Sequence, residues 1–300
     1  MLNRKFTTFN SRTNHSRDVV SKLKTMMLLD LPCAECIMEQ IEKGIPHKNE
    51  GFPILTPYEP VNNSGIYTIN CSKGHTSQTY IDNIDFEILF DYSINAIVDG
   101  YYREAVSSFT SSMERYFEFF IKVILRATGK EFETIQRIWK TIASQSERQL
   151  GAYIMLYNQT FDHEPKLLSQ NKEVPFRNSV IHKGYIPSKE EAIDFGDSTL
   201  EIIEKSLIKI IDKFPEAVKE TFNFFGYARI AKGKIKKQEE ESGIEKHVLC
   251  VNIMTTIDVN HGREINENDG RKGDILKQIT RVLERRTPRS LQLIKDKPRK

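Results

Sequence analysis

The chain has 300 residues, of which 39% are hydrophobic and 28% charged, with only 15 glycines and 11 prolines. These proportions are those of a globular protein, and they exclude wholesale disorder and the fibrous classes. No apolar run reaches the ~18 residues of a membrane span, so we expect no membrane contact. The net charge of +3 is too small to indicate nucleic-acid binding by itself.

The first residues give no sign of export. The opening MLNRKFTTFNSRTNHSR lacks the continuous apolar stretch of a secretory signal. Its shortage of acidic residues is shared with organelle presequences, but a cytoplasmic location is the favoured interpretation. Residues 1 to 82 then mix short strand-like pieces with Pro, Asn and Gly, which predicts a small module. Within it, the apolar spacing from Asp18 to Leu31 predicts one short helix.

Three of the four cysteines lie close together in this module, and their placement indicates a metal site. Cys33 and Cys36 are separated by two residues, while Cys71 and His75 lie on either side of a turn that Gly74 permits. Three thiolates and one imidazole complete a tetrahedral zinc site with no open position, which indicates a structural ion. The alternative is that the first pair is a redox pair or a coincidence and that the second is unrelated to it.

The pattern resembles a zinc ribbon over residues 31 to 81, with one His in place of a Cys. Strand-like sequences, GIYTIN and TSQTYI, lie on either side of the second ligand pair. The ion would hold this module together and take no part in chemistry.

Residues 83 to 228 are predicted to be all helical. Gly100 separates two antiparallel helices, and Gly129 ends the second. Ser188, with Glu191 three residues later, forms a capping box, and an apolar stripe then continues to Phe214. Pro215 is expected to stop that helix.

A short helix before the capping box carries the most informative motif. Asn178 and His182 are four residues apart and share a helix face, and Arg177 can reach the same side. Gly184 supplies a left-handed end to this helix. Glu114, on an earlier helix, could support these residues, but pairing with Arg115 or Lys122 is the favoured interpretation.

The motif and the order of helices resemble the HEPN superfamily over about residues 83 to 214. Its ribonuclease members carry an Arg, four to six residues and then a His, which Arg177 and His182 satisfy, and Asn178 matches the common Arg-Asn form. The resemblance implies metal-independent RNA cleavage at a site shared by two copies of the chain. His182 would activate a ribose 2′-hydroxyl, Arg177 would hold the phosphate, and Asn178 would orient the substrate or the His. The alternatives are a non-catalytic HEPN module, or an Arg and a His that only cap or form ion pairs within a bundle.

Residues 229 to 300 are the basic part of the chain, with a net charge of +7. The stretch from 229 to 245 has many charges and no apolar stripe, which predicts a solvated linker or an exposed helix. A strand-like segment, HVLCVNIMTTIDV, and a helix from Asp274 to Arg286 with Leu283 on its apolar face follow. The basic residues could attract RNA through its phosphates or could simply be a solvated terminus.

The sequence therefore predicts a mainly α protein in three parts: an N-terminal arm and zinc ribbon-like module (1–82), a HEPN-like antiparallel helical bundle (83–228), and a basic linker with an α+β extension (229–300). The favoured function is a cytoplasmic, homodimeric endoribonuclease. It would be a toxin or an antiviral abortive-infection effector, with an antitoxin that holds it or a trigger protein that activates it as partner. The alternative is a non-catalytic protein that binds nucleic acid or another protein.

Overall fold

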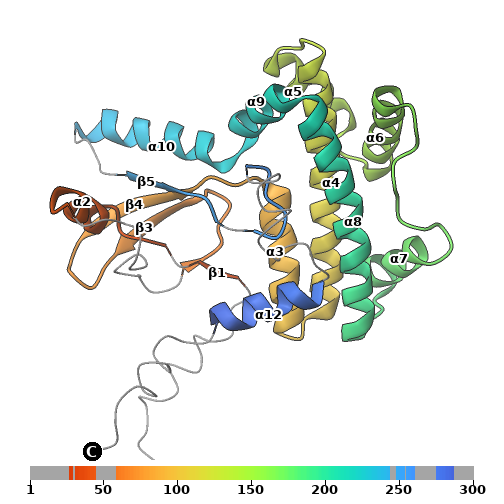
Figure 1. Cartoon of the computed structure of the whole chain (residues 1–300), viewed down its shortest axis with the longest axis horizontal. Coiled ribbons are helices and arrows are strands. Elements are labelled where there is room, and N and C mark those ends of the chain that lie inside the picture. Colours follow the sequence, from red (N-terminus) through yellow and green to blue (C-terminus); the bar gives the residue numbers. More distant parts are fainter. Residues whose placement is uncertain are drawn as a thin grey trace, which may run out of the picture.

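The structure, a computed structural model, describes residues 27–29, 31–44, 59–243, 248–253, 255–260 and 275–286. This part of the chain is mainly helical, as the sequence predicted, with a small sheet beside the helices (Figure 1). The N-terminal arm, and with it most of the helix expected from Asp18 to Leu31, lies outside the described residues. The described end of that segment is a strand, Leu28–Leu29, and not a helix.

The elements follow one another in a simple order along the chain. The N-terminal module contains β1 (Leu28–Leu29), α2 (Ala34–Glu42), β2 (Glu59–Pro60), β3 (Ile66–Asn70) and β4 (Thr76–Ile81). The helices that follow are α3 (Asp85–Val98), α4 (Tyr102–Ala127), α5 (Phe132–Ile142), α6 (Ser146–Phe161), α7 (Glu173–Lys183), α8 (Lys189–Lys213), α9 (Pro215–Phe225) and α10 (Tyr227–Ser242). Strand β5 (Val248–Val251) and helix α12 (Ile275–Arg286) complete the described chain.

The small sheet joins the two ends of the described chain. Strand β1 pairs with β2, and a three-stranded sheet has the order β3-β4-β5. Its hairpin is antiparallel, whereas β5 lies parallel to β4, with Leu249 opposite Thr79. A parallel pair needs a crossover connection, and here the whole helical region is that connection. The sheet therefore crosses the boundary expected at residue 229.

Helix α10 covers this sheet (Figure 1). Its residues Ala228, Ala231 and Ile235 are buried against Tyr80 of β4. The expectation of a segment without an apolar stripe was wrong, because alanines at helical spacing make a narrow stripe that is sufficient against a small sheet. The lysines of the segment remain exposed on its other sides.

The helical region packs around α4 and confirms the predicted helix ends. Gly100 and Gly129 both adopt positive φ, at 82°, directly after α3 and α4. The predicted capping box is present at α8: Glu191 N donates to Ser188 Oγ at 3.1 Å, and Ser188 N donates to Glu191 Oε2 at 2.8 Å. Aromatic side chains dominate the core, and the largest fully buried ones are Tyr116, Tyr153, Phe86, Phe90, Phe109, Phe119, Phe120, Phe195 and Phe222.

At Pro215 the structure confirms the sequence prediction and adds to it, and at α12 it corrects one residue. Pro215 ends α8 as predicted, since that helix stops at Lys213, and it also occupies the first turn of α9, which follows. Proline suits this position since the first N–H groups of a helix have no intrahelical partner. In α12, Ile275, Ile279 and Val282 are buried as predicted, but Leu283 is 51% exposed. The helix packs on α3 and α8 through a narrower face than its sequence suggested.

Candidate functional site

The predicted metal ligands come together at the edge of the N-terminal module. Cys33 is the N-cap of α2 and Cys36 lies in its first turn, while Cys71 and His75 lie at the two ends of the turn between β3 and β4. One ligand atom from each of the four residues lies within 4.8 Å of all the others. The alternative in which the second pair is unrelated to the first is therefore wrong.

The distances within this Cys3His cluster suit a tetrahedral ion. Cys36 Sγ lies 3.6 Å from Cys71 Sγ and 3.3 Å from His75 Nδ1. Metal–ligand bonds of about 2.0 to 2.3 Å at tetrahedral angles separate ligand atoms by roughly 3.5 to 3.8 Å. The cluster could thus hold a metal ion, and its three sulfurs and one nitrogen are ligands that zinc accepts.

Local backbone structure accounts for the convergence. In the hairpin turn, Cys71 N donates to His75 O and Gly74 N donates to Cys71 O, each at 3.0 Å. Gly74 has a φ of 86°, a backbone conformation that is costly for any residue with a side chain. Beside the first pair, Ser77 Oγ donates to Cys33 Sγ at 3.4 Å and accepts from Ala34 N at 3.1 Å. Strand β4 is thereby fixed to the start of α2.

The first ligand pair departs from the predicted zinc ribbon. The second pair lies beside strands, as expected, but the first opens a helix. The residues after Cys36, IMEQIE, include good helix formers, and the buried Ile37 faces the module. The N-terminus of α2 carries a partial positive charge, which favours thiolates at that end.

The thiols differ in how readily they ionise. Burial and hydrogen bonds with the neighbouring thiols raise the pKa of Cys36 to about 12. Burial also tends to raise the pKa of Cys71. Hydrogen bonds from backbone N–H groups of the hairpin turn outweigh this effect and lower the pKa of Cys71 to about 7. A cation among these sulfurs would favour the thiolate at every one of them.

Glu39 is a residue of this site that the sequence analysis missed. Its Oε1 lies 3.1 Å from His75 Nε2, and its Oε2 accepts from Lys73 Nζ at 2.9 Å. The hydrogen bond from Lys73 holds the pKa of this carboxyl below its ordinary value. The available signal was spacing, because Glu39 follows Cys36 by three residues and therefore shares its helix face.

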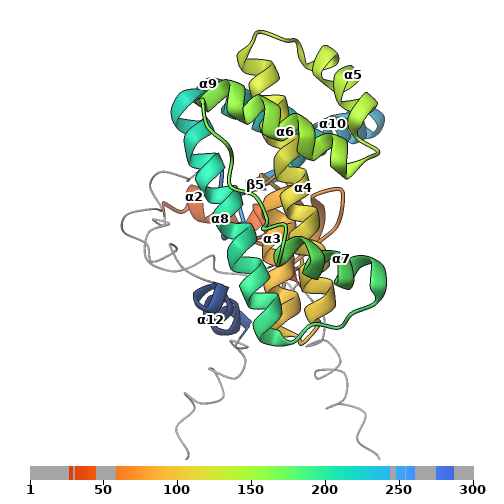
Figure 2. The ribbon, with the colours of Figure 1, turned by 90° about the vertical axis from the view of Figure 1, so that its right-hand side faces the viewer.

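The predicted RNA-cleavage motif lies on α7, which packs against α4 together with α6 and α8 (Figure 2). Val180 anchors the helix in the core, and Gly184 ends it with φ of 73°, as predicted. Arg177 Nη1 donates to Asn178 Oδ1 at 2.9 Å. His182 is exposed and one helical turn beyond Asn178, so both remain available on one face of α7.

Glu114 pairs with the motif and not with its own helix neighbours. Arg177 Nη2 donates to Glu114 Oε1 at 3.2 Å, while Arg115 and Lys122 both pair with Glu118. The favoured interpretation of Glu114 was therefore wrong. Residues three or four apart on a helix are neighbours, and Glu118 lies three residues after Arg115 and four before Lys122. This spacing assigns both bases to Glu118 and leaves Glu114 for a partner from another helix, which is Arg177.

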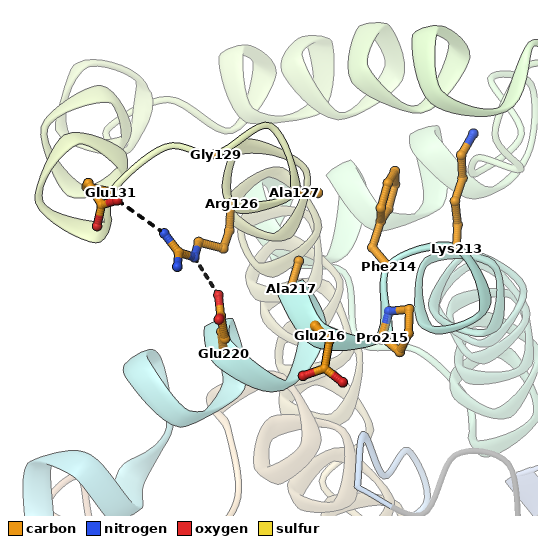
Figure 3. Close-up of a pocket in the computed structure, with 10 residues that line it drawn as sticks. All are labelled: Arg126, Ala127, Gly129, Glu131, Lys213, Phe214, Pro215, Glu216, Ala217 and Glu220. Carbon is orange, nitrogen blue, oxygen red and sulfur yellow. Dashed lines mark hydrogen bonds and ion pairs between the residues drawn. The ribbon is translucent and has the colours of Figure 1, made fainter.

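An open hollow of about 540 Å³ lies at the C-terminal end of α4 (Figure 3). Arg126 bridges its walls, with Nε 2.5 Å from Glu220 Oε2 and Nη1 3.7 Å from Glu131 Oε1. Because Arg126 follows Glu114 by twelve residues, the hollow lies about 18 Å along the helix from that acid. It shares no residue with the Cys3His cluster or with the α7 motif.

Comparison of the chain with protein-family models, curated proteins and solved structures gives no significant match. None of the described helices combines the length and the apolar character that crossing a bilayer requires.

Proposed function

We propose that the chain is a metal-independent endoribonuclease of HEPN type, with a structural zinc ion in its N-terminal module. The observation that carries the cleavage proposal is the arrangement on α7, where Arg177 is held between Asn178 and Glu114 while His182 faces solvent. The order of two long antiparallel helices, the motif helix and a capped long helix is compatible with this family.

The α7 side chains have the chemistry that cleavage needs. The neutral imidazole of His182 accepts the proton of a ribose 2′-hydroxyl, because the lone pair on its unprotonated ring nitrogen is a base. The freed 2′-oxygen attacks the adjacent phosphorus, and the P–O5′ bond breaks. The His182 of a second copy supplies a proton to the departing 5′-oxygen. The products are a 2′,3′-cyclic phosphate and a 5′-hydroxyl.

Arg177 stabilises the charge that develops on the phosphate oxygens. Glu114 and Asn178 each accept one N–H of its guanidinium, which fixes the plane of the group and leaves further N–H groups for an anion. Its side chain is 22% exposed, so it is partly desolvated and yet accessible. Preorganised donors of this kind stabilise a transition state without having to reorient.

Zinc would have a separate task in this proposal. Cys33, Cys36, Cys71 and His75 supply four ligands and leave no open position, which is typical of a structural ion. Zinc would supply stability to the module, and the cleavage chemistry would remain with the α7 side chains.

The test compares two exposed histidines in the purified full-length protein. His182→Ala should lower the cleavage rate by about 10²- to 10⁴-fold, the usual contribution of a general base. His163→Ala is the matched control, because His163 is also exposed but lies in the loop after α6. Products should carry cyclic phosphate ends without added metal. Intact RNA, or equal cleavage by both variants, would overturn the proposal.

A shared site also requires two copies of the chain. We expect a homodimer, and dilution that dissociates it should abolish cleavage in parallel. A monomer at micromolar concentration that still cuts RNA would contradict the shared site. The wider role, a toxin or antiviral effector that an antitoxin restrains or a trigger protein activates, rests on family analogy. Growth arrest with RNA loss in cells expressing wild type, but not His182→Ala, tests it.

The second candidate is a non-catalytic RNA-binding protein, which the exposed lysines of α10 favour. Lys232, Lys234, Lys236 and Lys237 are all exposed on this helix, although the last two pair with Glu240 and Glu241. Such a protein would retain RNA and leave it intact. The basic residues 287 to 300 lie outside the described residues.

A further inference from the structure

The two ring nitrogens of His75 face different partners. Nδ1 lies 3.3 Å from Cys36 Sγ, toward the other ligands, and Nε2 lies 3.1 Å from Glu39 Oε1. We propose that His75 binds the metal through Nδ1 and that Glu39 is the positioning residue that fixes its ring. This inference rests on the proposed zinc ion and adds to it the nitrogen that binds and the residue that selects it.

The chemistry of a neutral imidazole supports this assignment. Only one ring nitrogen carries a hydrogen, and the other offers a lone pair. When Nε2 donates to the Glu39 carboxylate, Nδ1 presents its lone pair toward the sulfurs, ready to bind a cation. The opposite tautomer would set the Nε2 lone pair against a carboxylate oxygen, which is repulsive. Glu39 therefore favours the tautomer that can bind metal.

The arrangement links α2 to the hairpin by two contacts besides the metal. Glu39 lies one turn after Cys36 on α2, and both of its partners, Lys73 and His75, belong to the turn after β3. Zinc with three thiolates carries a net negative charge, so an isolated carboxylate beside it would be repelled. Lys73, 2.9 Å from Glu39 Oε2, offsets that repulsion and holds the carboxylate in place.

The affinity test uses two glutamates of the same helix. Glu39→Ala should weaken zinc binding by about 10- to 100-fold in competition with a chromogenic chelator, as is usual when an outer partner of a ligand is lost. Glu42→Ala, exposed and on the same helix, should change it less than about twofold. Glu39→Gln should recover part of the loss, because its amide oxygen still accepts from Nε2. The Glu39 side chain is 34% exposed, so truncation leaves no buried cavity.

A second measurement reads the nitrogen directly. Long-range ¹H–¹⁵N spectra of the zinc-loaded full chain should show His75 with its proton on Nε2 and the metal on Nδ1. Metal on Nε2, or equal zinc affinity in Glu39→Ala and wild type, would overturn the inference while leaving the zinc proposal standing. A wild-type protein that binds no zinc would overturn both.

Discussion

The N-terminal module and the helical region are stabilised in different ways. The core of the helical region consists of many large apolar and aromatic side chains. The module has a much smaller buried cluster, and three of its members are Cys33, Cys36 and Cys71. A module of this size buries too little apolar surface to be stable without a further constraint, which metal ligation can supply. The difference predicts that the stability of the N-terminal module depends on a metal ion, whereas that of the helical region does not.

The C-terminal segment connects these two regions. Strand β5 adds to the sheet of the module, while residues 255 to 260 and α12 pack on α3. On α3, Glu87 accepts from Val259 N at 2.7 Å, and Asp91 accepts from Thr256 N at 2.8 Å. The main cores of the two regions are therefore distinct, and the returning segment connects them together with Ile88 of α3, which joins the cluster of the module, and with α10, which covers the sheet.

Loss of the proposed zinc ion should have the largest effect and tests the comparison directly. Structural zinc contributes about 10 kcal/mol or more to small modules, so Cys36→Ser should unfold the module. The helices α3, α4 and α8 should remain folded because their core contains none of the ligands. Metal content, far-ultraviolet circular dichroism and amide exchange measure the outcome. Cys250→Ser, at an exposed cysteine, is the matched control.

Amide exchange can sharpen this prediction further. Because β5 pairs only with β4 in the described sheet, its amides should lose protection together with the hairpin. A chain that holds no zinc by elemental analysis, or helices that melt along with the module, would contradict the comparison.

Arg281→Met should destabilise the contact between α12 and α3 by about 3 kcal/mol. Arg281 Nη2 lies 3.2 Å from Asp91 Oδ2, and the Asp91 side chain is only 5% exposed, so the variant leaves a buried carboxylate without its cation. Urea unfolding monitored by circular dichroism measures the loss. Leu276→Ala, at an exposed position of the same helix, should cost much less. Equal losses in the two variants would mean that the ion pair does not hold the segment.

Glu87→Gln should change the free energy of unfolding by about 1 to 3 kcal/mol, and its difference from wild type should depend on pH. Burial raises the pKa of Glu87 from 4.5 to about 8, against hydrogen bonds from Val259 N, Asn83 and Ile84 N that lower it. The folded state therefore retains a proton that the unfolded state has lost. The stabilisation is complete below pH 4.5 and is lost as the pH rises toward about 8.

The measurement is the free energy of unfolding of both proteins at several pH values across this range. Glutamine does not titrate, so wild type should lose stability relative to Glu87→Gln as the pH rises. The metal site titrates equally in both proteins and cancels in the difference. A difference that is independent of pH would contradict the prediction.

Ser188→Ala should have the smallest effect, about 1 kcal/mol, because it removes the side-chain half of the capping box at α8. Thermal unfolding of the helical region should shift to lower temperature. Zinc affinity should stay unchanged, since α8 packs on α3, α4, α9 and α12, whereas the candidate ligands lie at the start of α2 and in the turn between β3 and β4. A change in zinc affinity would show that the two regions are more tightly coupled than their separate cores indicate.

The sequence by itself determined the features that depend on neighbours along the chain. Gly100, Gly129 and the Ser188 capping box set helix ends, and each was predictable because caps and turns act within a few residues. The four residues of the Cys3His cluster could be picked out for the same reason, since each pair spans one short turn, and the ion itself stays a prediction. The HEPN interpretation of α7 stays a prediction.

Only the tertiary structure decided the pairings between distant segments. The parallel partner of β4 lies beyond the whole helical region, and Arg177 meets an acid 63 residues earlier in the chain. Glu39 reaches His75 only after α2 packs against the hairpin. Such pairings depend on where packed elements place side chains. Spacing along one helix helps only by showing which local partners are already taken. Here Glu118 takes Arg115 and Lys122, so that neither is left for Glu114.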